Sequence, residues 1–203
     1  LNGDGVPDLV LGETNNTSSA APNAYVVYGD GDPSDGGTFE ELSGLRLTDF
    51  AGGDLNGDGL DDGAVISTTG NAANLFRVTV GHGGDIDNDG IDDFLVGVPG
   101  ISSVASNAGQ AFLVFGSATG HDSLTDMIGD NGNAVLNFDG HVLNQNVGRS
   151  VSTIGDINND GYADFIIGAT REAALTGRGK AYVVFGDERA NLATLSAAIE
   201  SRA

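Results

Sequence analysis

The chain has 203 residues and a formal net charge of −21, which arises from 29 acidic and 8 basic side chains. This charge argues against nucleic acid as a partner and against attraction to an anionic membrane. The chain contains no cysteine, which excludes a disulfide scaffold, and its hydrophobic content of 39 % is enough for a packed core.

An acidic phrase returns four times along the sequence, each time before an apolar run. The copies are LNGDGVPD at 1–8, DLNGDGLDD at 54–62, DIDNDGIDD at 85–93 and DINNDGYAD at 156–164. Oxygen-bearing side chains stand at alternate positions and are followed by a glycine that permits a sharp turn and by a closing aspartate. Plain turns also use Asp, Asn and Gly, but repetition in one register favours an array of calcium loops.

The predicted calcium ligands are side-chain oxygens at loop positions one, three, five and nine and the backbone carbonyl at position seven. The candidate ligands are Asn2, Asp4, Val6 and Asp8; Asp54, Asn56, Asp58, Leu60 and Asp62; Asp85, Asp87, Asp89, Ile91 and Asp93; and Asp156, Asn158, Asp160, Tyr162 and Asp164. The leading aspartate of the first copy would precede residue 1. The sequence therefore predicts three complete Ca²⁺ loops and one truncated loop.

The residues after each loop distinguish this pattern from an EF-hand. An EF-hand loop ends in a bidentate Glu at position twelve and lies between helices. Here position twelve is Val65, Val96 or Ile167. The runs that follow the loops, at 9–14, 94–99 and 165–170, are rich in β-forming residues and predict strands. Helical calcium modules are therefore disfavoured.

A second repeated phrase lies downstream of three of the loops. It reads AYVVYG at 24–29, AFLVFG at 111–116 and AYVVFG at 181–186, and each copy predicts a strand that ends at a glycine. One repeat is therefore a strand, a metal loop, a strand, a turn and a further strand. Several short strands per repeat predict a β-propeller. Residues 187–203 predict a short amphipathic helix with Leu192, Leu195 and Ile199 on its apolar face.

The segments 147–170 and 179–186 resemble the FG-GAP repeat of integrin α-chain propellers and their bacterial relatives. Val147-Gly148 stands at the Phe-Gly position of that family, Gly168-Ala169-Thr170 stands at the Gly-Ala-Pro position, and Gly97-Val98-Pro99 is a close variant of the latter. The resemblance implies an all-β fold of β-propeller blades in which each blade carries calcium in a hairpin loop.

The expected array contains about three to four repeats, with approximate bounds 1–44, 45–75, 76–146 and 147–203. Both ends fall within repeats, so a segment of a longer propeller is expected, which when expressed alone is partly unfolded or associates. The repeat at 45–75 departs from the pattern because no second strand phrase fits between Asp62 and Asp85. This blade lacks its outer strands or is built differently.

The sequence predicts a non-enzymatic, extracellular calcium-binding module for adhesion or for recognition of a protein or glycan, secreted or attached to the cell surface. The millimolar calcium outside cells suits sites of this type. The expected partners are that protein or glycan and the rest of the propeller, with no nucleic acid and no insertion into a membrane. His82, His121 and His141 are predicted to be loop or surface residues, without a catalytic motif around them.

The alternative function is the non-catalytic or catalytic propeller part of a secreted calcium-dependent polysaccharide lyase or phospholipase-like hydrolase. A constellation of Lys, Tyr or Arg on the face opposite the loops would discriminate between the two. Four arginines cluster in the last third of the chain, where pairing with neighbouring acids is favoured over contact with an anionic glycan. They are Arg149, Arg171, Arg178 and Arg189.

Overall fold

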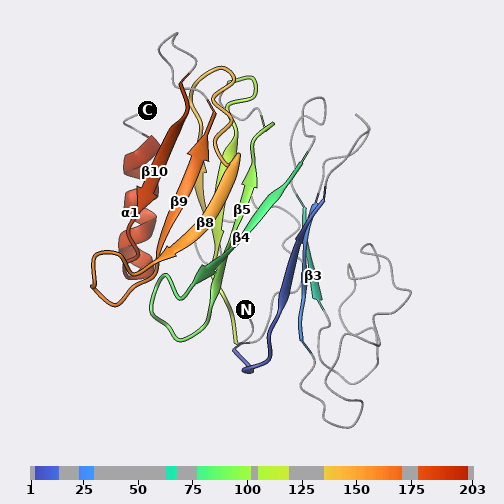
Figure 1. Cartoon of the computed structure of the whole chain (residues 1–203), viewed down its shortest axis with the longest axis vertical. Coiled ribbons are helices and arrows are strands. Elements are labelled where there is room, and N and C mark those ends of the chain that lie inside the picture. Colours follow the sequence, from blue (N-terminus) through green and yellow to red (C-terminus); the bar gives the residue numbers. More distant parts are fainter. Residues whose placement is uncertain are drawn as a thin grey trace.

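The computed structural model describes residues 3–13, 23–29, 63–67, 77–101, 105–118, 135–170 and 178–200, which form stacked antiparallel sheets and one helix (Figure 1). The strands are β1 (Leu9–Gly12), β2 (Asn23–Val27), β3 (Gly63–Ser67), β4 (Thr79–Gly84), β5 (Asp93–Val98), β6 (Gln110–Val114), β7 (Val135–Asp139), β8 (Ser150–Gly155), β9 (Asp164–Ala169) and β10 (Lys180–Val184). The mainly-β class predicted from the sequence is confirmed. Closure of the sheets into a propeller ring stays a prediction.

The strand order follows the repeats. One sheet has the order β4-β5-β6-β7 and another the order β10-β9-β8. In both sheets the first strand pairs antiparallel with the strand after the acidic loop, and the register shifts beside the loop, between His82 and Gly84 and between Thr153 and Gly155. Such a bulge bends the strand where it enters the loop. The predicted succession of strand, loop, strand and strand is confirmed for these two repeats.

Strand β3 is the described part of the short repeat predicted at 45–75. It pairs antiparallel with β2, from Val27↔Gly63 to Asn23↔Ser67, and is the third strand of the sheet β1-β2-β3. It holds in this sheet the place that β7 holds beside β6. The predicted boundary between residues 44 and 45 assigned this strand to a separate repeat. In the structure it pairs within the first sheet, and the repeat bounds stay a prediction.

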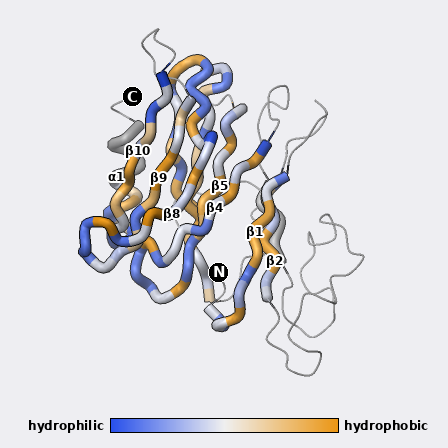
Figure 2. The backbone as a smooth tube through the Cα atoms, viewed as in Figure 1, coloured by the Kyte–Doolittle hydropathy of each residue, from blue (hydrophilic) through white to orange (hydrophobic). Residues whose placement is uncertain are grey.

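The sheet β4-β5-β6-β7 is covered on both faces because β5 and β6 alternate their side chains between two hydrophobic clusters. Phe94 and Val96 pack in one cluster with residues of β2, whereas Leu95 packs in the other with Phe165 of β9. All six residues of β5 are buried. Figure 2 shows that hydrophobic residues gather on the stacked strands, whereas many loop residues are hydrophilic. This two-sided burial fixes the strand ends that carry the acidic loops.

The predicted C-terminal helix is confirmed as α1 (Arg189–Glu200), which contacts β7. Leu192 is 1 % exposed and belongs to the cluster between the sheets β4-β5-β6-β7 and β10-β9-β8. The side chains of Leu195 and Ile199 lie outside the described residues. Across the described ranges, no helix has the length and apolarity needed to cross a membrane.

Candidate metal centre

The loop at 85–93 is folded around its own acidic side chains. The Asp85 carboxylate accepts hydrogen bonds from the backbone amides of Asp89 (2.9 Å) and Gly90 (3.0 Å). The Asp89 carboxylate accepts one from the Ile91 amide (2.9 Å). Asn88 and Gly90 have φ angles of 57° and 92°, in the left-handed region that Asn and Gly tolerate best. These residue types therefore allow the chain to turn twice within the loop.

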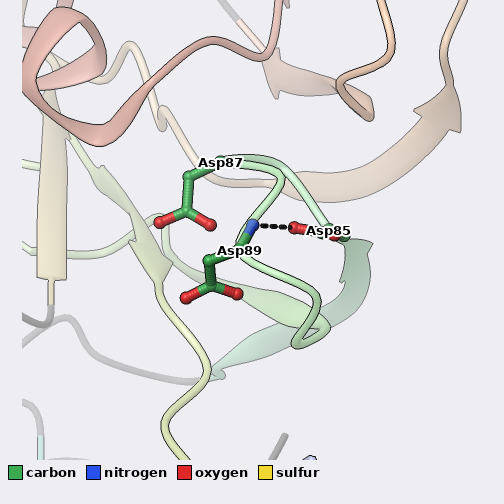
Figure 3. Close-up of side chains that lie close together, drawn as sticks. All are labelled: Asp85, Asp87 and Asp89. Atoms are coloured by element: carbon green, nitrogen blue, oxygen red, sulfur yellow. Dashed lines mark hydrogen bonds between the residues drawn. The ribbon is translucent and has the colours of Figure 1, made fainter.

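The turn brings three of the predicted ligands together. Asp85, Asp87 and Asp89 each offer a carboxylate oxygen, and these oxygens lie within 4.8 Å of one another (Figure 3). Calcium holds oxygen ligands at about 2.3–2.6 Å, so two oxygens on opposite sides of one ion lie about 5 Å apart. The cluster therefore fits Ca²⁺ in both spacing and donor type, and these three residues would hold it.

The electrostatics of the cluster also favour a cation. Burial raises the pKa of Asp87, and the negative charge of Asp89 raises it further. Arg189, at the start of α1, acts in the opposite direction, with its Nε 3.6 Å from Asp87 Oδ2. The Arg189 guanidinium also lies 3.9 Å from the centre of the Phe115 ring. The sequence patterns did not indicate that this arginine would reach a metal loop of the preceding repeat.

Asp93, predicted as the ligand at position nine, lies outside this cluster of three. It is fully buried, and its two carboxylate oxygens accept hydrogen bonds from the amides of Ile86 (2.8 Å) and Gly116 (2.9 Å). Burial raises the pKa of Asp93 to about 7, although both hydrogen bonds act to lower it. The side chain thus joins the start of the loop to the end of β6. Its role as a ligand, like that of the Ile91 carbonyl, stays a prediction.

The loop at 156–164 repeats this framework. Asp156 accepts hydrogen bonds from the amides of Asp160 (3.1 Å) and Gly161 (2.9 Å), and Asp160 accepts one from the Tyr162 amide (3.0 Å). Asn158, at position three, supplies a carboxamide in place of a carboxylate and donates to Asp160 Oδ2 (2.7 Å). This loop therefore has the same hydrogen-bonded turn, with one negative charge fewer among its predicted ligands.

The closing aspartate of that loop also has the same partners as its counterpart. Asp164 is fully buried and accepts hydrogen bonds from the amides of Ile157 (2.8 Å) and Gly186 (2.9 Å). Its role as a ligand, like that of the Tyr162 carbonyl, stays a prediction. We call Asp93 and Asp164 the bracing aspartates. Asp93 connects its loop to Gly116, just after β6, and Asp164 connects its loop to Gly186, just after β10.

Part of the framework is visible in the truncated first loop. Asp4 accepts a hydrogen bond from the Val6 amide (2.7 Å), and Asp8 accepts one from the Gly29 amide (2.9 Å). The predicted ligand Asn2 lies outside the described residues. So do all five predicted ligands of the second copy, namely Asp54, Asn56, Asp58, Leu60 and Asp62.

The glycine that ends each second strand phrase is a functional residue that the sequence patterns marked without explaining. Gly29, Gly116 and Gly186 donate their amides to the closing aspartates. A Cβ atom on Gly116 would lie 2.4 Å from Ile91 Cγ2, and one on Gly186 would lie 2.4 Å from the Ala163 carbonyl oxygen. Only glycine lets the end of this strand approach the loop closely enough to form the hydrogen bond.

Neighbouring loops are also connected to each other. The Ala163 amide of the loop at 156–164 donates a hydrogen bond to the Asp85 carbonyl of the loop at 85–93 (3.1 Å). On the other side, a Cβ atom on Gly3 would lie 3.3 Å from Ile91 Cγ1, which places the truncated first loop against the loop at 85–93. The described loops therefore lie next to one another along one end of the stacked sheets.

Comparison with protein families agrees with this construction. Residues 147–184 match the family model of the FG-GAP repeat, and the match includes β8, the loop at 156–164, β9 and β10. No curated protein matches the chain. FG-GAP repeats commonly bind Ca²⁺. The segment 147–184 is therefore an FG-GAP repeat, and the acidic loop at its centre has the same hydrogen-bonded framework as the loop that holds the aspartate cluster.

Proposed function

We propose that the chain is an extracellular calcium-binding β-propeller module that serves adhesion or the recognition of a protein or glycan. The observation that carries the proposal is the cluster of Asp85, Asp87 and Asp89 on a loop whose framework recurs in an FG-GAP repeat. In this proposal the module is not an enzyme, and calcium stabilises the loops that join its strands.

The donor set favours calcium over transition metals. All three clustered donors are carboxylate oxygens, which hard cations prefer, whereas zinc and copper prefer imidazole and thiolate ligands. The other predicted oxygen donors of this loop are the Ile91 carbonyl and the Asp93 carboxylate, and water can complete the shell. Calcium tolerates such an irregular shell better than magnesium does. A calcium site of this type also suits secretion, since extracellular calcium is abundant enough to occupy weak sites.

The proposed role of the ion is structural. Without a cation, the like charges of the three aspartates repel one another at short range. A bound divalent cation removes this repulsion and binds only the folded loop, so it stabilises the folded chain by RT ln(1 + [L]/Kd). Because the bracing aspartates tie each loop to two strands, stabilising the loops stabilises the sheets that would present a recognition surface.

The proposal is tested by thermal melting of the chain in a chelator and in millimolar calcium, with magnesium as the ionic control. Each occupied site should add about 2.7 kcal/mol at roughly a hundredfold excess of calcium over Kd. The melting temperature should therefore rise in calcium and change much less in magnesium. Superimposable melts in chelator and calcium would refute a structural role for the metal.

A further inference from the structure

A second polar site lies at the end of the sheets opposite the metal loops. It is a pocket of about 380 Å³ lined by Arg77, Pro99, Gly100, Asn107, Asn146, Arg149 and Thr170. Arg77 and Arg149 precede β4 and β8, whose other ends lead into the acidic loops, and Thr170 follows β9. The pocket therefore combines residues of two consecutive repeats. Its volume is in the range of small-molecule sites.

The floor of the pocket is organised by one side chain. Asn146 donates hydrogen bonds to the carbonyls of Pro99 (3.2 Å) and Asn107 (3.1 Å) and accepts one from the Thr170 hydroxyl (3.1 Å). Asn107 and Asn146 have φ angles of 53° and 55°, so both stand at tight turns. These contacts hold three loops in fixed positions. A ligand that binds here meets a preformed polar surface and loses little affinity to ordering it.

The two arginines give the pocket a positive charge within a strongly acidic chain. Both residues are exposed, and among the residues that the structure describes neither is within ion-pairing distance of a carboxylate. The carboxylate of Glu13, whose carbonyl accepts the Val78 amide beside Arg77, instead accepts a hydrogen bond from the Asn23 amide (3.0 Å). The guanidinium groups are thus available to an external anion.

The backbones next to the arginines are fixed. The Arg149 amide donates to the Gly168 carbonyl (3.1 Å), and the Val78 amide, beside Arg77, donates to the Glu13 carbonyl (2.9 Å). Two planar guanidinium groups on fixed backbones suit a carboxylate, which accepts paired hydrogen bonds from each fork. Asn, Thr and backbone carbonyl groups around them suit hydroxyl groups. Among the described residues that line the pocket none is aromatic, so none of them offers a ring on which a base could stack.

We propose that this pocket binds the carboxylate-bearing ring of an acidic sugar, with Arg77 and Arg149 on the carboxylate and the polar floor on the ring hydroxyls. The inference rests on the proposed function, because it names the ligand class for a recognition module. It assigns recognition to the end of the sheets remote from calcium.

The test compares two sugars that differ in one group. Methyl β-glucuronide and its uncharged counterpart methyl β-glucoside are titrated into the whole chain in saturating calcium, and binding is followed by NMR. The glucuronide should bind and the glucoside should bind about tenfold more weakly or not at all, because charge-assisted hydrogen bonds are lost. An N-acetylglutamate titration distinguishes an acidic sugar from an acidic side chain of a protein ligand.

Variants assign the binding to the pocket. Arg77→Gln and Arg149→Gln should each weaken glucuronide binding about tenfold or more, while Arg178→Gln, an exposed arginine outside the pocket, should leave it unchanged. Unchanged melting temperatures show that the variants fold. Equal binding of both sugars, stronger binding of N-acetylglutamate, or glucuronide binding that survives both substitutions would overturn the inference. Calcium binding measured in the same samples separates this failure from failure of the proposed function.

Discussion

Two repeats of this chain share one sequence pattern but differ in what covers them. Leu113 and Phe115 in the sheet β4-β5-β6-β7 are fully buried, because the sheet β10-β9-β8 and α1 pack against them. The matching residues Val183 and Phe185 in the sheet β10-β9-β8 are 47 % and 48 % exposed. The acidic loops of both repeats nevertheless share the hydrogen bonds from backbone amides to the aspartates at positions one, five and nine. The loop framework is thus a local property of each repeat, whereas burial of the strand phrase depends on a neighbouring sheet.

The largest expected effect tests the difference in burial between Phe115 and Phe185. Phe115→Ala should lower the free energy of unfolding by about 3–5 kcal/mol, since it leaves a cavity between two sheets. Phe185→Ala should cost less than about 1 kcal/mol, since half of that side chain already contacts water. Urea denaturation of both variants measures the two values. Similar losses would mean that the exposed face is covered in solution.

The next effect tests whether the two loops share one hydrogen-bonded framework. Asp93→Ala and Asp164→Ala should destabilise their repeats to a similar extent, because each removes the acceptor of two backbone amides. A buried donor left without a partner costs about 1–3 kcal/mol. The denaturation is performed in a chelator so that calcium does not contribute.

Asp92→Ala serves as the control for the bracing aspartates. Its carboxylate is exposed and, within the described ranges, forms an ion pair with His82 alone, at 3.2 Å. The substitution should therefore lower the free energy of unfolding by less than about 1 kcal/mol. If Asp92→Ala destabilised the chain as much as Asp93→Ala, the hydrogen bonds to the backbone would not be the source of the effect.

Ligand substitutions compare the two loops directly. Asp89→Ala and Asp160→Ala remove the oxygen at position five and should weaken calcium binding by about tenfold or more at their own loop, because affinity depends on the number of charged ligands. Asp92→Ala, at position eight, should bind calcium nearly normally. Calorimetric titration measures the affinities. Equal losses in all three variants would mean that only the diffuse negative charge attracts the ion.

The smallest expected effect concerns Arg189. Its guanidinium lies 3.6 Å from an oxygen of Asp87, a cluster residue whose side chain is only 5 % exposed. Arg189→Gln removes a positive charge that competes with the ion, so calcium should bind the loop at 85–93 a few-fold more tightly. The loop at 156–164 provides the internal control. NMR titration follows each loop separately, and an equal change at both loops would contradict a local effect.

Local patterns predicted much of this fold, because the determinants lie within a few residues of one another. The alternation of acidic residues with Asn88 and Gly90 encodes a turn, and the β-branched and aromatic run after Asp93 encodes a strand. The helix over 189–200 followed from its apolar spacing. Each of these features needs no information about distant residues.

Features that depend on distant partners were not predictable in the same way. The apolar run at 63–67 indicates a strand, but nothing within it specifies pairing with β2. Asp93 has the position of a ligand in the loop pattern, whereas its partner Gly116 lies on another strand. The pocket at the opposite end is lined by Arg77 and Arg149, which come from two different repeats, so it could not be predicted from either repeat alone.

The hydrogen bond from the Ala163 amide to the Asp85 carbonyl has a consequence for how the loops fill. It joins the eighth residue of one loop to the first residue of another, so the two metal sites share part of their backbone ordering. An ion that orders the loop at 85–93 also restricts the neighbouring loop before that loop binds its own ion. We therefore expect the second ion to lose less conformational entropy on binding than the first, and calcium uptake to be positively cooperative.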